Sequence, residues 1–356
     1  MGKTLNKVAV IVPVYNAKKT IKACVKSLQT QTLKDILIVL VDDGSRDGSS
    51  DLCDEFAAKD SRIIVIHQEN KGAQAARITG WLSSPAQSCK YLMTCDADDR
   101  MPKDAIEKLY EAAESNGADC ACGDMASMWK FITFKNENWR ECFKISSPKV
   151  YNHGEIINEL YVSCFGCQNF PVSLWAKIYK TDFLTKSLDY ISPVKFKSDD
   201  LALTIRIMPV SEKLVVIPDV VYYYRIGGTT SRFMPYLLDD WLAIYKVKCE
   251  MSQRYKMPQD IDTLMNAELM NYVNSYLLMC KKSGHFTDSA FMDEIKRVCE
   301  IKEVIAGAKF LSNKPDKNFT AENICNKNYD AINSVISERA NARSFKQMIK
   351  SILLKL

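Results

Sequence analysis

Hydrophobic and polar positions alternate in blocks over the N-terminal part of the chain. Continuous apolar runs of strand length occur at Val8–Val14, Ile36–Val41, Arg62–His67 and Tyr91–Cys95. The segments between these runs place apolar residues at the three- and four-residue spacing of a helix. Strands without two-residue alternation, separated by amphipathic helices, are typical of a parallel sheet covered on both faces. The pattern therefore predicts an α/β fold with a mostly parallel sheet flanked by helices.

The pattern becomes less regular after about residue 125. Residues 129–134 are apolar and aromatic enough for one further strand, and mixed helix and loop are expected up to about Arg232. From Pro235 onward helical periodicity dominates and glycine almost disappears. We therefore expect an α/β domain over residues 1–235, with halves of about 1–125 and 126–235, and a helical region over 236–356.

Composition adds several restrictions to this picture. Of 356 residues, 47% are hydrophobic and 26% charged, and the net charge of +5 comes without a dense basic block, so a nucleic-acid partner is not expected. The 13 cysteines lack a repeating spacing and only three histidines exist, which favours free buried thiols in a reducing cytoplasm over a zinc site. No signal peptide or membrane-spanning run is recognisable, so the expected location is the cytoplasm.

Polar and acidic residues follow each of the four apolar runs. These segments are, in order, YNA, DDGSRDGS, QENKGAQAARITG and DADD. Each taken singly is also explained as a turn or a helix cap. In a doubly wound sheet, however, the carboxyl ends of the strands form the edge where ligands bind. Adjacent aspartates at two separate strand ends therefore indicate a binding site at that edge.

The densest acidic group consists of Asp96, Asp98 and Asp99. Carboxylates this close raise one another's pKa unless a cation joins them, and oxygen ligands favour Mg²⁺ or Mn²⁺. Mg²⁺ is typically held by one or two carboxylates together with substrate phosphates. Neither a G-x-x-x-x-G-K-[ST] loop nor a G-x-G-x-x-G after the first run is present, which argues against Walker-type hydrolases and dinucleotide enzymes. A phosphate-bearing substrate held through a metal is therefore expected.

At this point a family resemblance becomes visible. VIVPVYNAKKTIKACVKSLQTQT, VDDGSRDGS, NKGAQAARITG and CDADD, in this order, resemble the nucleotide-sugar half of the family 2 glycosyltransferases, which have the Rossmann-like GT-A fold. SLWAKIYKTDFL, KSDDLALTIRI and YYYRIGGTTSR resemble weaker motifs of the acceptor half. The resemblance implies inverting, divalent-metal-dependent transfer of a sugar from a nucleotide-diphospho-sugar, most often UDP-linked, to a glycan or lipid-linked glycan in polysaccharide biosynthesis.

The resemblance also assigns residues to the nucleotide. It places the base against the stretch that contains Pro13, Tyr15 and Asn16, and against Asp43, whose carboxylate would bond the imide edge of uracil. Arg77 occupies the place of the family's arginine and is expected to face the acidic edge.

The metal and the diphosphate are assigned in the same way. Asp96 and Asp98 form the D-x-D element that touches ribose and metal, and Asp99 would support the metal or the substrate. Tyr224 and Arg225 would lie close to the donor diphosphate.

On the acceptor side, family members often have Glu-Asp where this chain has Asp199 and Asp200. The resemblance makes Asp200 the base that deprotonates the acceptor hydroxyl, and the replacement of glutamate by Asp199 leaves the choice between them open. Both residues also suit the start of a helix. Ile78 stands where the family often has asparagine, which is a donor-side variation. Trp175 and Lys177 are balanced between core packing and acceptor contact.

A single displacement with an aspartate base inverts the anomeric centre, whereas retention would require a second carboxylate beneath the sugar, which no segment indicates.

Two other functions stay open at this stage. The D-x-D element is also found in phosphatases that use an aspartate nucleophile, although there it follows the first strand. A catalytically inactive GT-A-like binding subunit is the other alternative.

The end of the chain has a pattern of its own. After Glu338 the charged residues are all basic: Arg339, Arg343, Lys346, Lys350 and Lys355. The apolar residues of this segment fall on one face of the expected helix: Phe345, Met348, Ile349, Ile352, Leu353 and Leu356. Such a helix either lies in an anionic membrane surface or packs on its own domain. Because many relatives extend lipid-linked glycans, a peripheral contact with the inner membrane face is one expectation.

Overall fold

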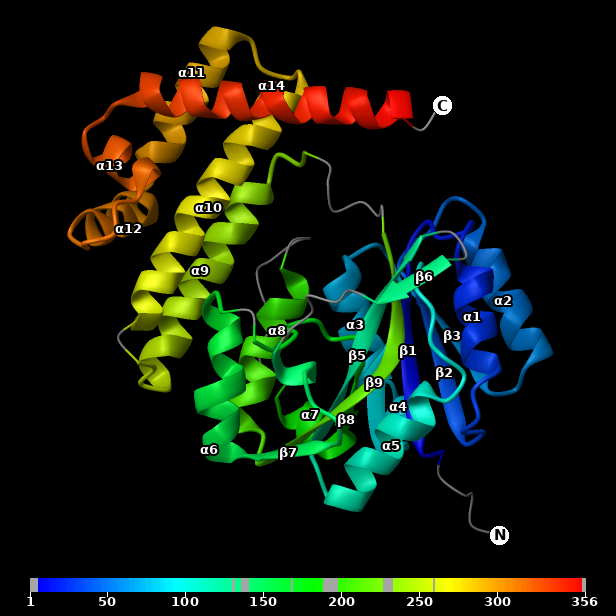
Figure 1. Ribbon diagram of the computed structural model, residues 1–356. Coiled ribbons are helices and arrows are strands. Elements are labelled where there is room, and N and C mark those ends of the chain that lie inside the picture. The colour runs from blue at the N-terminus through cyan, green and yellow to red at the C-terminus, as the bar shows by residue number, and fades with distance from the viewer. Residues whose placement is uncertain are drawn as a thin grey trace. The chain divides into compact units, whose positions relative to one another are not determined.

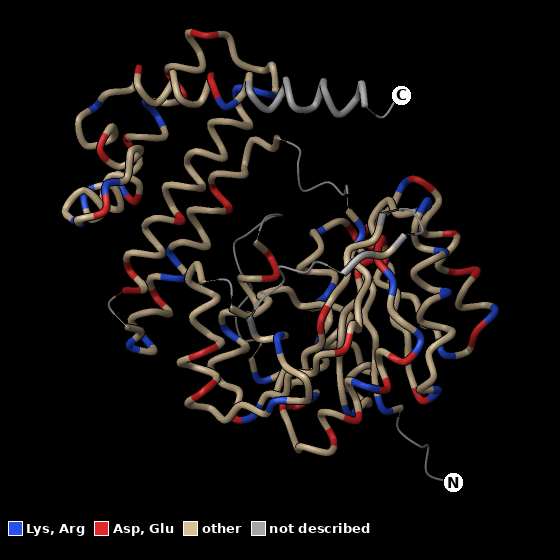
Figure 2. Tube along the Cα trace, in the orientation of Figure 1, with Lys and Arg blue, Asp and Glu red and all other residues tan. Residues whose placement is uncertain are grey.

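A computed structural model describes residues 6–129, 132–135, 141–167, 169–187, 198–226, 233–258 and 260–353 (Figure 1). The chain divides into two compact units, Met1–Gly228 and Thr229–Leu356. Lysine and arginine positions are interspersed with aspartate and glutamate positions along both units (Figure 2).

One mixed sheet forms the centre of the first unit. Its described strands are β1 (Val8–Val14), β2 (Ile36–Asp42), β3 (Ile63–His67), β4 (Tyr91–Thr94), β5 (Cys120–Trp129), β6 (Ile132–Lys135), β7 (Lys149–Asn152), β8 (Lys177–Lys180) and β9 (Lys213–Arg225). They lie in the order β3-β2-β1-β4-β8-β5-β9-β7, and β6 pairs with β5. The first four strands are parallel, as the apolar runs predict.

Antiparallel pairing enters where β8 lies between β4 and β5. Beyond it, β5 and β9 are parallel, and β7 is antiparallel to β9. The one strand expected over residues 129–134 is wrong in detail. Trp129 ends β5 and Ile132 begins β6, so the segment belongs to two antiparallel strands and not to one.

Helices surround the sheet of the first unit. The α-helices are α1 (Ile21–Gln29), α2 (Ser49–Lys59), α3 (Ala73–Leu82), α4 (Ser84–Gln87), α5 (Ala105–Asn116), α6 (His153–Glu155), α7 (Thr181–Lys186) and α8 (Asp199–Ile207). Short 3₁₀ or π turns are η1 (Glu141–Phe143), η2 (Ile156–Leu160), η3 (Tyr161–Phe165) and η4 (Met208–Val210).

Both faces of the parallel strands are buried, which explains why hydrophobic and polar residues do not alternate along them. Val10 and its neighbours at even positions of β1 pack in one cluster with α1, α2 and α5. Ile11, on the opposite face, packs against α3. All of these strand residues have no exposed surface, and each contributes about 1.5–3 kcal/mol through burial.

A glycine brings α3 unusually close to this sheet. A Cβ atom at Gly80 would lie 2.5 Å from Cγ2 of Ile11, closer than such atoms approach. Only glycine therefore permits the observed packing of α3 on β1. The seating of α3 matters for the site, because Arg77 lies one turn before Gly80 on the same helix.

Helices alone form the described part of the second unit. They are α9 (Leu237–Arg254), α10 (Asp260–Ser283), α11 (Asp288–Cys299), α12 (Lys302–Ser312), α13 (Phe319–Cys325) and α14 (Tyr329–Leu353), and they enclose a separate hydrophobic core. Lys248 of α9 is buried in this unit and pairs with Glu268 of α10.

The membrane expectation concerns the end of α14. The backbone of α14 is helical to Leu353, but the side chains of the expected apolar and basic stripes lie outside the described residues from 342 onward. No helix among the described residues combines the length and the apolar character that a membrane crossing requires. The cysteines are free, and most of them are buried.

The His67 side chain ties β3 to two carboxylates, and this makes the stability of the first unit sensitive to pH. Nδ1 lies 3.1 Å from Oδ2 of Asp42, and Nε2 lies 3.1 Å from Oδ1 of Asp54. The hydrogen bond with Asp42, followed by that with Asp54, raises the pKa of His67. Both ring nitrogens thus face a carboxylate, which favours the protonated imidazolium over the neutral ring.

We expect the His67→Gln variant to lose stability relative to the wild type only at lower pH. A raised pKa means that the imidazolium stabilises the fold fully below the unfolded pKa of about 6.5, and that this contribution is lost as pH rises through the folded pKa. Because the side chain is 45% exposed, the difference should stay below about 1 kcal/mol. Thermal unfolding of both proteins between pH 5.5 and pH 9 measures it, and a difference that grows toward alkaline pH would contradict the assignment.

Candidate active site

The acidic turn Asp96–Asp99 follows directly on the end of β4. Cys95 donates its backbone N–H to the Ile11 carbonyl of β1 over 3.0 Å. On the other side, Arg100 and Tyr223 of β9 exchange two backbone hydrogen bonds of 3.2 and 2.8 Å. The turn is thus fixed between β1 and β9 at the carboxyl edge of the parallel strands, where the strand order changes direction.

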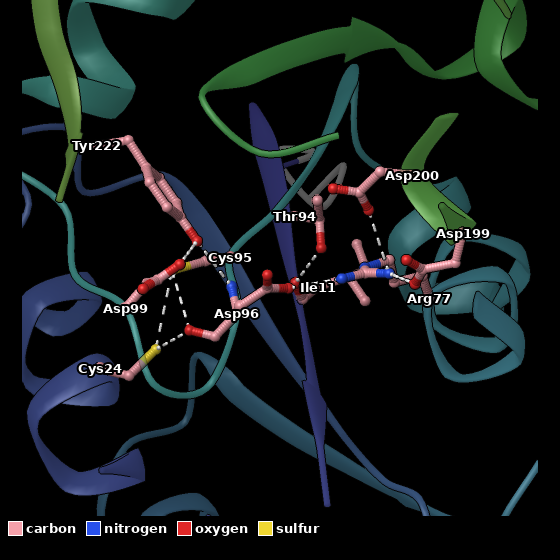
Figure 3. Close-up of polar contacts among 10 residues, drawn as sticks. All are labelled: Ile11, Cys24, Arg77, Thr94, Cys95, Asp96, Asp99, Asp199, Asp200 and Tyr222. Atoms are coloured by element: carbon pink, nitrogen blue, oxygen red, sulfur yellow. Dashed lines mark hydrogen bonds and ion pairs between the residues drawn. The ribbon is translucent and has the colours of Figure 1, made fainter. Parts of the chain in front are cut away.

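The Tyr222 hydroxyl holds this turn from within (Figure 3). It accepts the N–H of Asp96 over 3.0 Å and donates to Oδ2 of Asp99 over 2.8 Å. The N–H of Arg225 donates to Oδ1 of Asp99 over 2.7 Å. Burial, and then the charges of Asp96 and Asp98, raise the pKa of Asp99. Asp99 therefore faces the protein and shapes the turn, instead of presenting its carboxylate to a ligand.

Arg77 joins the two halves of the site (Figure 3). Its Nη2 donates to Oδ1 of Asp96 over 2.8 Å, and its Nη1 donates to Oδ2 of Asp199 over 2.5 Å. The same Nη1 lies 3.3 Å from Oδ1 of Asp200. Burial alone would lower the pKa of Arg77, but the three carboxylates outweigh it and raise that pKa further. A buried guanidinium thus connects the donor-side turn with the start of α8.

Asp43, assigned to the nucleotide base, is buried at the end of β2. Its carboxylate accepts Nε2 of Gln68 over 2.7 Å and the N–H groups of Lys71 and Gly72, each over 2.9 Å. These bonds fix the loop that leads into α3, and hence the position of Arg77. A carboxylate offers about four acceptor positions, so three such bonds leave one for a further donor.

The other residues assigned to the base lie beside the same edge. Pro13 pairs with Val41 within the sheet, and Tyr15 is 54% exposed. Asn16 adopts a φ of 49°, donates its N–H to Ser45 Oγ over 3.0 Å and is bonded through Oδ1 to the loop after β2. The ends of β1 and β2 are therefore brought together as the sequence predicts for a parallel sheet.

Asp199 and Asp200 differ although they are neighbours in the first turn of α8. The N–H of Leu174 lowers the pKa of Asp200, and among the described residues Oδ1 of Asp200 forms no hydrogen bond, only the ion pair with Nη1 of Arg77 at 3.3 Å. Burial raises the pKa of Asp200 to about 7, Arg77 opposes this rise, and Asp199 adds to it. Asp200 therefore has a proton affinity suited to a general base near neutral pH, and its Oδ1 is held by the ion pair with Arg77 and not by a hydrogen bond.

Trp175 and Lys177, the two residues weakly assigned to the acceptor, lie in different surroundings. Trp175 stacks on Tyr222, with ring centroids 4.7 Å apart, and on Tyr224, with centroids 5.6 Å apart. It is partly exposed beside the acidic turn. Lys177, in contrast, is buried, and its ammonium donates to two backbone carbonyls. This structure offers Lys177 no access to an acceptor.

The carboxylates of the turn can be tested for a fit to a divalent cation. Asp96 forms an ion pair with Arg77, and Asp99 accepts a hydrogen bond from Tyr222. The expectation that a divalent ion compensates the charge of all three carboxylates is therefore wrong. No group of three metal-binding side chains occurs among the described residues. Burial and then Asp96 nevertheless raise the pKa of Asp98, and Arg225 only partly offsets this. Asp98, with the second oxygen of Asp96, fits the one or two carboxylates that Mg²⁺ or Mn²⁺ takes beside substrate phosphates.

Two contributors were missed by the sequence reasoning. Tyr222 lies in YYYR, where only Tyr224 and Arg225 were singled out. The N–H of Leu174 carries no signal in a sequence, because any residue except proline supplies one. An aromatic strand opposite an acidic turn was the only available hint for Tyr222.

Comparisons with known proteins identify the family. The model of "Glycosyl transferase family 2" matches residues 9–169. The chain is 32% identical to the glycosyltransferase GlyG of Streptococcus pneumoniae over 222 residues, which cover 61% of this chain and 70% of that protein. It is also 32% identical over 274 residues to GlyA of the same organism, and this match spans 69% of the chain but only 38% of GlyA.

Solved structures show the same fold. Residues 1–349 of S. aureus TarS, crystallised in complex with UDP-GlcNAc, superpose with a TM-score of 0.64 at 17% identity, covering 94% of this chain and 92% of that one. Family and fold together decide against the aspartate-nucleophile phosphatase. The chain belongs to glycosyl transferase family 2 and is a glycosyltransferase with the GT-A fold.

Proposed function

We propose that this protein transfers a sugar from a UDP-linked donor to a glycan or lipid-linked glycan acceptor, with inversion, in polysaccharide biosynthesis. The observation that carries the proposal is the buried Arg77, which holds the D-x-D residue Asp96 and the aspartates of α8 in one cluster. The UDP-GlcNAc complex of TarS, a protein of the same fold, supports a UDP-sugar as donor.

The acceptor proton goes to Asp200 in this proposal. Oδ1 of Asp200 lies 3.3 Å from Nη1 of Arg77 and forms no hydrogen bond among the described residues, whereas Oδ2 of Asp199 accepts a hydrogen bond of 2.5 Å from the same nitrogen. A base must have a free lone pair within reach of the hydroxyl that it deprotonates. Asp199 then orients Arg77, and Arg77 keeps the Asp200 carboxylate beside the donor-side turn. One base and one displacement account for inversion.

The donor side contributes binding and orientation. Pro13, Tyr15, Asn16 and Asp43 would hold the base, and the Arg225 side chain would accompany the diphosphate. Asp98 and Asp96 would hold Mn²⁺ or Mg²⁺, which when bound neutralises the charge of the leaving diphosphate. A lipid-linked acceptor would bring the protein to the inner face of the membrane, with the end of α14 as its contact.

Asp98→Asn should abolish metal-dependent binding of the donor nucleotide. Loss of one of two carboxylates removes both a ligand and the charge that attracts the cation, so the affinity for UDP in the presence of Mn²⁺ should fall about 100-fold or more. Calorimetric titration of UDP with and without Mn²⁺ measures this.

The matched control is Asp104→Asn, which removes a carboxylate paired with Lys108 at the start of α5. It should leave UDP affinity unchanged. Unchanged Mn²⁺-dependent affinity in Asp98→Asn would show that Asp98 is no metal ligand. Turnover of UDP-sugars by the wild type separates the proposed enzyme from an inactive binding subunit.

A further inference from the structure

Lys177 is a buried cation whose charge the proposed chemistry does not use. Its side chain is 1% exposed, and Nζ donates to the carbonyl oxygens of Pro171 over 2.9 Å and Ser173 over 2.5 Å. Nζ also lies 5.0 Å from the centre of the Phe170 ring. Among the described residues no carboxylate forms an ion pair with Lys177. Removing an ammonium from water costs several kcal/mol, so this arrangement needs a compensating gain.

The compensation for burying the ammonium comes from segment 170–176, which we name the carbonyl loop. Lys177 begins β8, and β8 is held by β4 and β5 on its two sides. The ammonium therefore reaches back from a rigid strand into the loop that precedes it. Thr204 Oγ1 of α8 donates to the Val172 carbonyl over 2.9 Å, and the loop ends at Ala176 with a φ of 58°. A non-glycine residue with positive φ is costly and persists only where its surroundings impose it.

The carbonyl loop carries two contacts that reach the active site. The N–H of Leu174 faces the Asp200 carboxylate and lowers its pKa, and the Val172 carbonyl accepts Thr204 Oγ1 of α8, the helix that begins with Asp199 and Asp200. The next side chain, Trp175, stacks on Tyr222 at an interplanar angle of 11°. The Tyr222 hydroxyl in turn bonds to Asp96 and Asp99. One loop thus touches the proposed base with its backbone and the donor-side turn with its side chain.

We propose that Lys177 is a positioning residue: its ammonium gathers the inward-pointing carbonyls of the carbonyl loop, so that Leu174 N–H and Trp175 hold Asp200 and Tyr222 in register. This inference rests on the proposed function for its kinetic consequence. It replaces the expected acceptor contact of Lys177. Without the ammonium, two buried carbonyls would face each other with no donor between them, and the loop would move to find other partners.

Lys177→Met keeps a long apolar side chain and removes the ammonium. The amides of residues 172–176 should exchange faster with deuterium, as followed by mass spectrometry. Release of UDP from UDP-GlcNAc should slow about 100-fold in kcat, which is the cost of a misplacement of about 1 Å. The Kd for UDP with Mn²⁺ should change by less than about threefold, because the backbone groups of Tyr223 and Arg225 hold the acidic turn independently of Trp175.

The chain offers a matched control in Lys248, which is also 1% exposed but lies in the helical unit. Lys248→Met should lower the unfolding temperature and leave both kcat and the exchange of residues 172–176 unchanged. Equal losses of kcat in the two variants, or normal exchange in Lys177→Met, would overturn the proposal. If the wild type releases no UDP, the proposed donor fails, while the exchange measurement still decides whether Lys177 holds the loop.

Discussion

Asp200→Asn is expected to lower kcat for sugar transfer about 10³-fold while UDP affinity stays close to that of the wild type. Asparagine keeps the shape and can still accept the Leu174 N–H, but it cannot take a proton. The donor-side turn does not depend on Asp200 for its hydrogen bonds. Comparison of single-turnover transfer with calorimetric UDP binding separates these two effects.

The pH dependence provides an independent measurement of the same assignment. With a pKa of about 7, Asp200 is protonated and inactive as a base at lower pH, so wild-type kcat should fall as pH drops below 7. Asp199→Asn serves as the paired control, because it keeps the base and changes only the partner of Arg77. Should Asp199→Asn lose transfer while Asp200→Asn retains it, the roles of the two aspartates would be reversed.

Arg77→Met should cause the largest loss of stability among the changes considered. It leaves the partly buried carboxylates of Asp96, Asp199 and Asp200 without their common, buried cation, and breaking a buried ion pair costs about 3–5 kcal/mol. For a unit of this size, each kcal/mol corresponds to about 2–4 °C, so the first unit should unfold about 6–20 °C lower. Differential scanning calorimetry of the full chain measures this shift.

The direction in which the stability loss of Arg77→Met changes with pH identifies the cause of this loss. Arg77 lowers the pKa of Asp200, so without the guanidinium the folded pKa of this carboxyl rises further above its unfolded value, and the folded state gains protons and stability as pH falls. The defect of Arg77→Met should therefore be largest at pH 8 and shrink toward pH 5. Arg62→Met is the control, since Arg62 pairs with Asp60 at a partly exposed site and should cost about 1 kcal/mol or less. A defect independent of pH would mean that lost packing, not unpaired charge, is responsible.

The sequence predicts the parallel part of the fold well because the evidence for it is local. Runs such as Val8–Val14 have the length and the continuous apolar character of strands buried on both faces. The chain order of these runs and the rule that ligands bind at their carboxyl ends place Asp43 and Asp96 near one edge. Antiparallel β8 could not be foreseen, since its pairing with β4 joins segments far apart in the chain.

The same distinction applies to the site. The family motif identifies Asp96 and Asp200 as polar residues of interest, but no pattern indicates that Arg77 contacts both Asp96 and Asp199. That contact depends on the tight packing of Gly80 on Ile11, which is a property of the folded chain. For Lys177 the sequence left core packing and acceptor contact open, and the choice is decided by backbone carbonyls that a sequence does not display.

The insertion of β8 between β4 and β5 has a consequence for how this protein is made. While the ribosome has not yet released Lys177–Lys180, the fourth parallel strand has an open edge, and the strand Cys120–Trp129 has no neighbour on that side. A nascent chain in this condition exposes unpaired backbone that invites association with other chains. Because β8 belongs to the acceptor half and pairs with β4 and β5, which begin in the donor half, we expect that the two halves cannot be exchanged between relatives as independent modules.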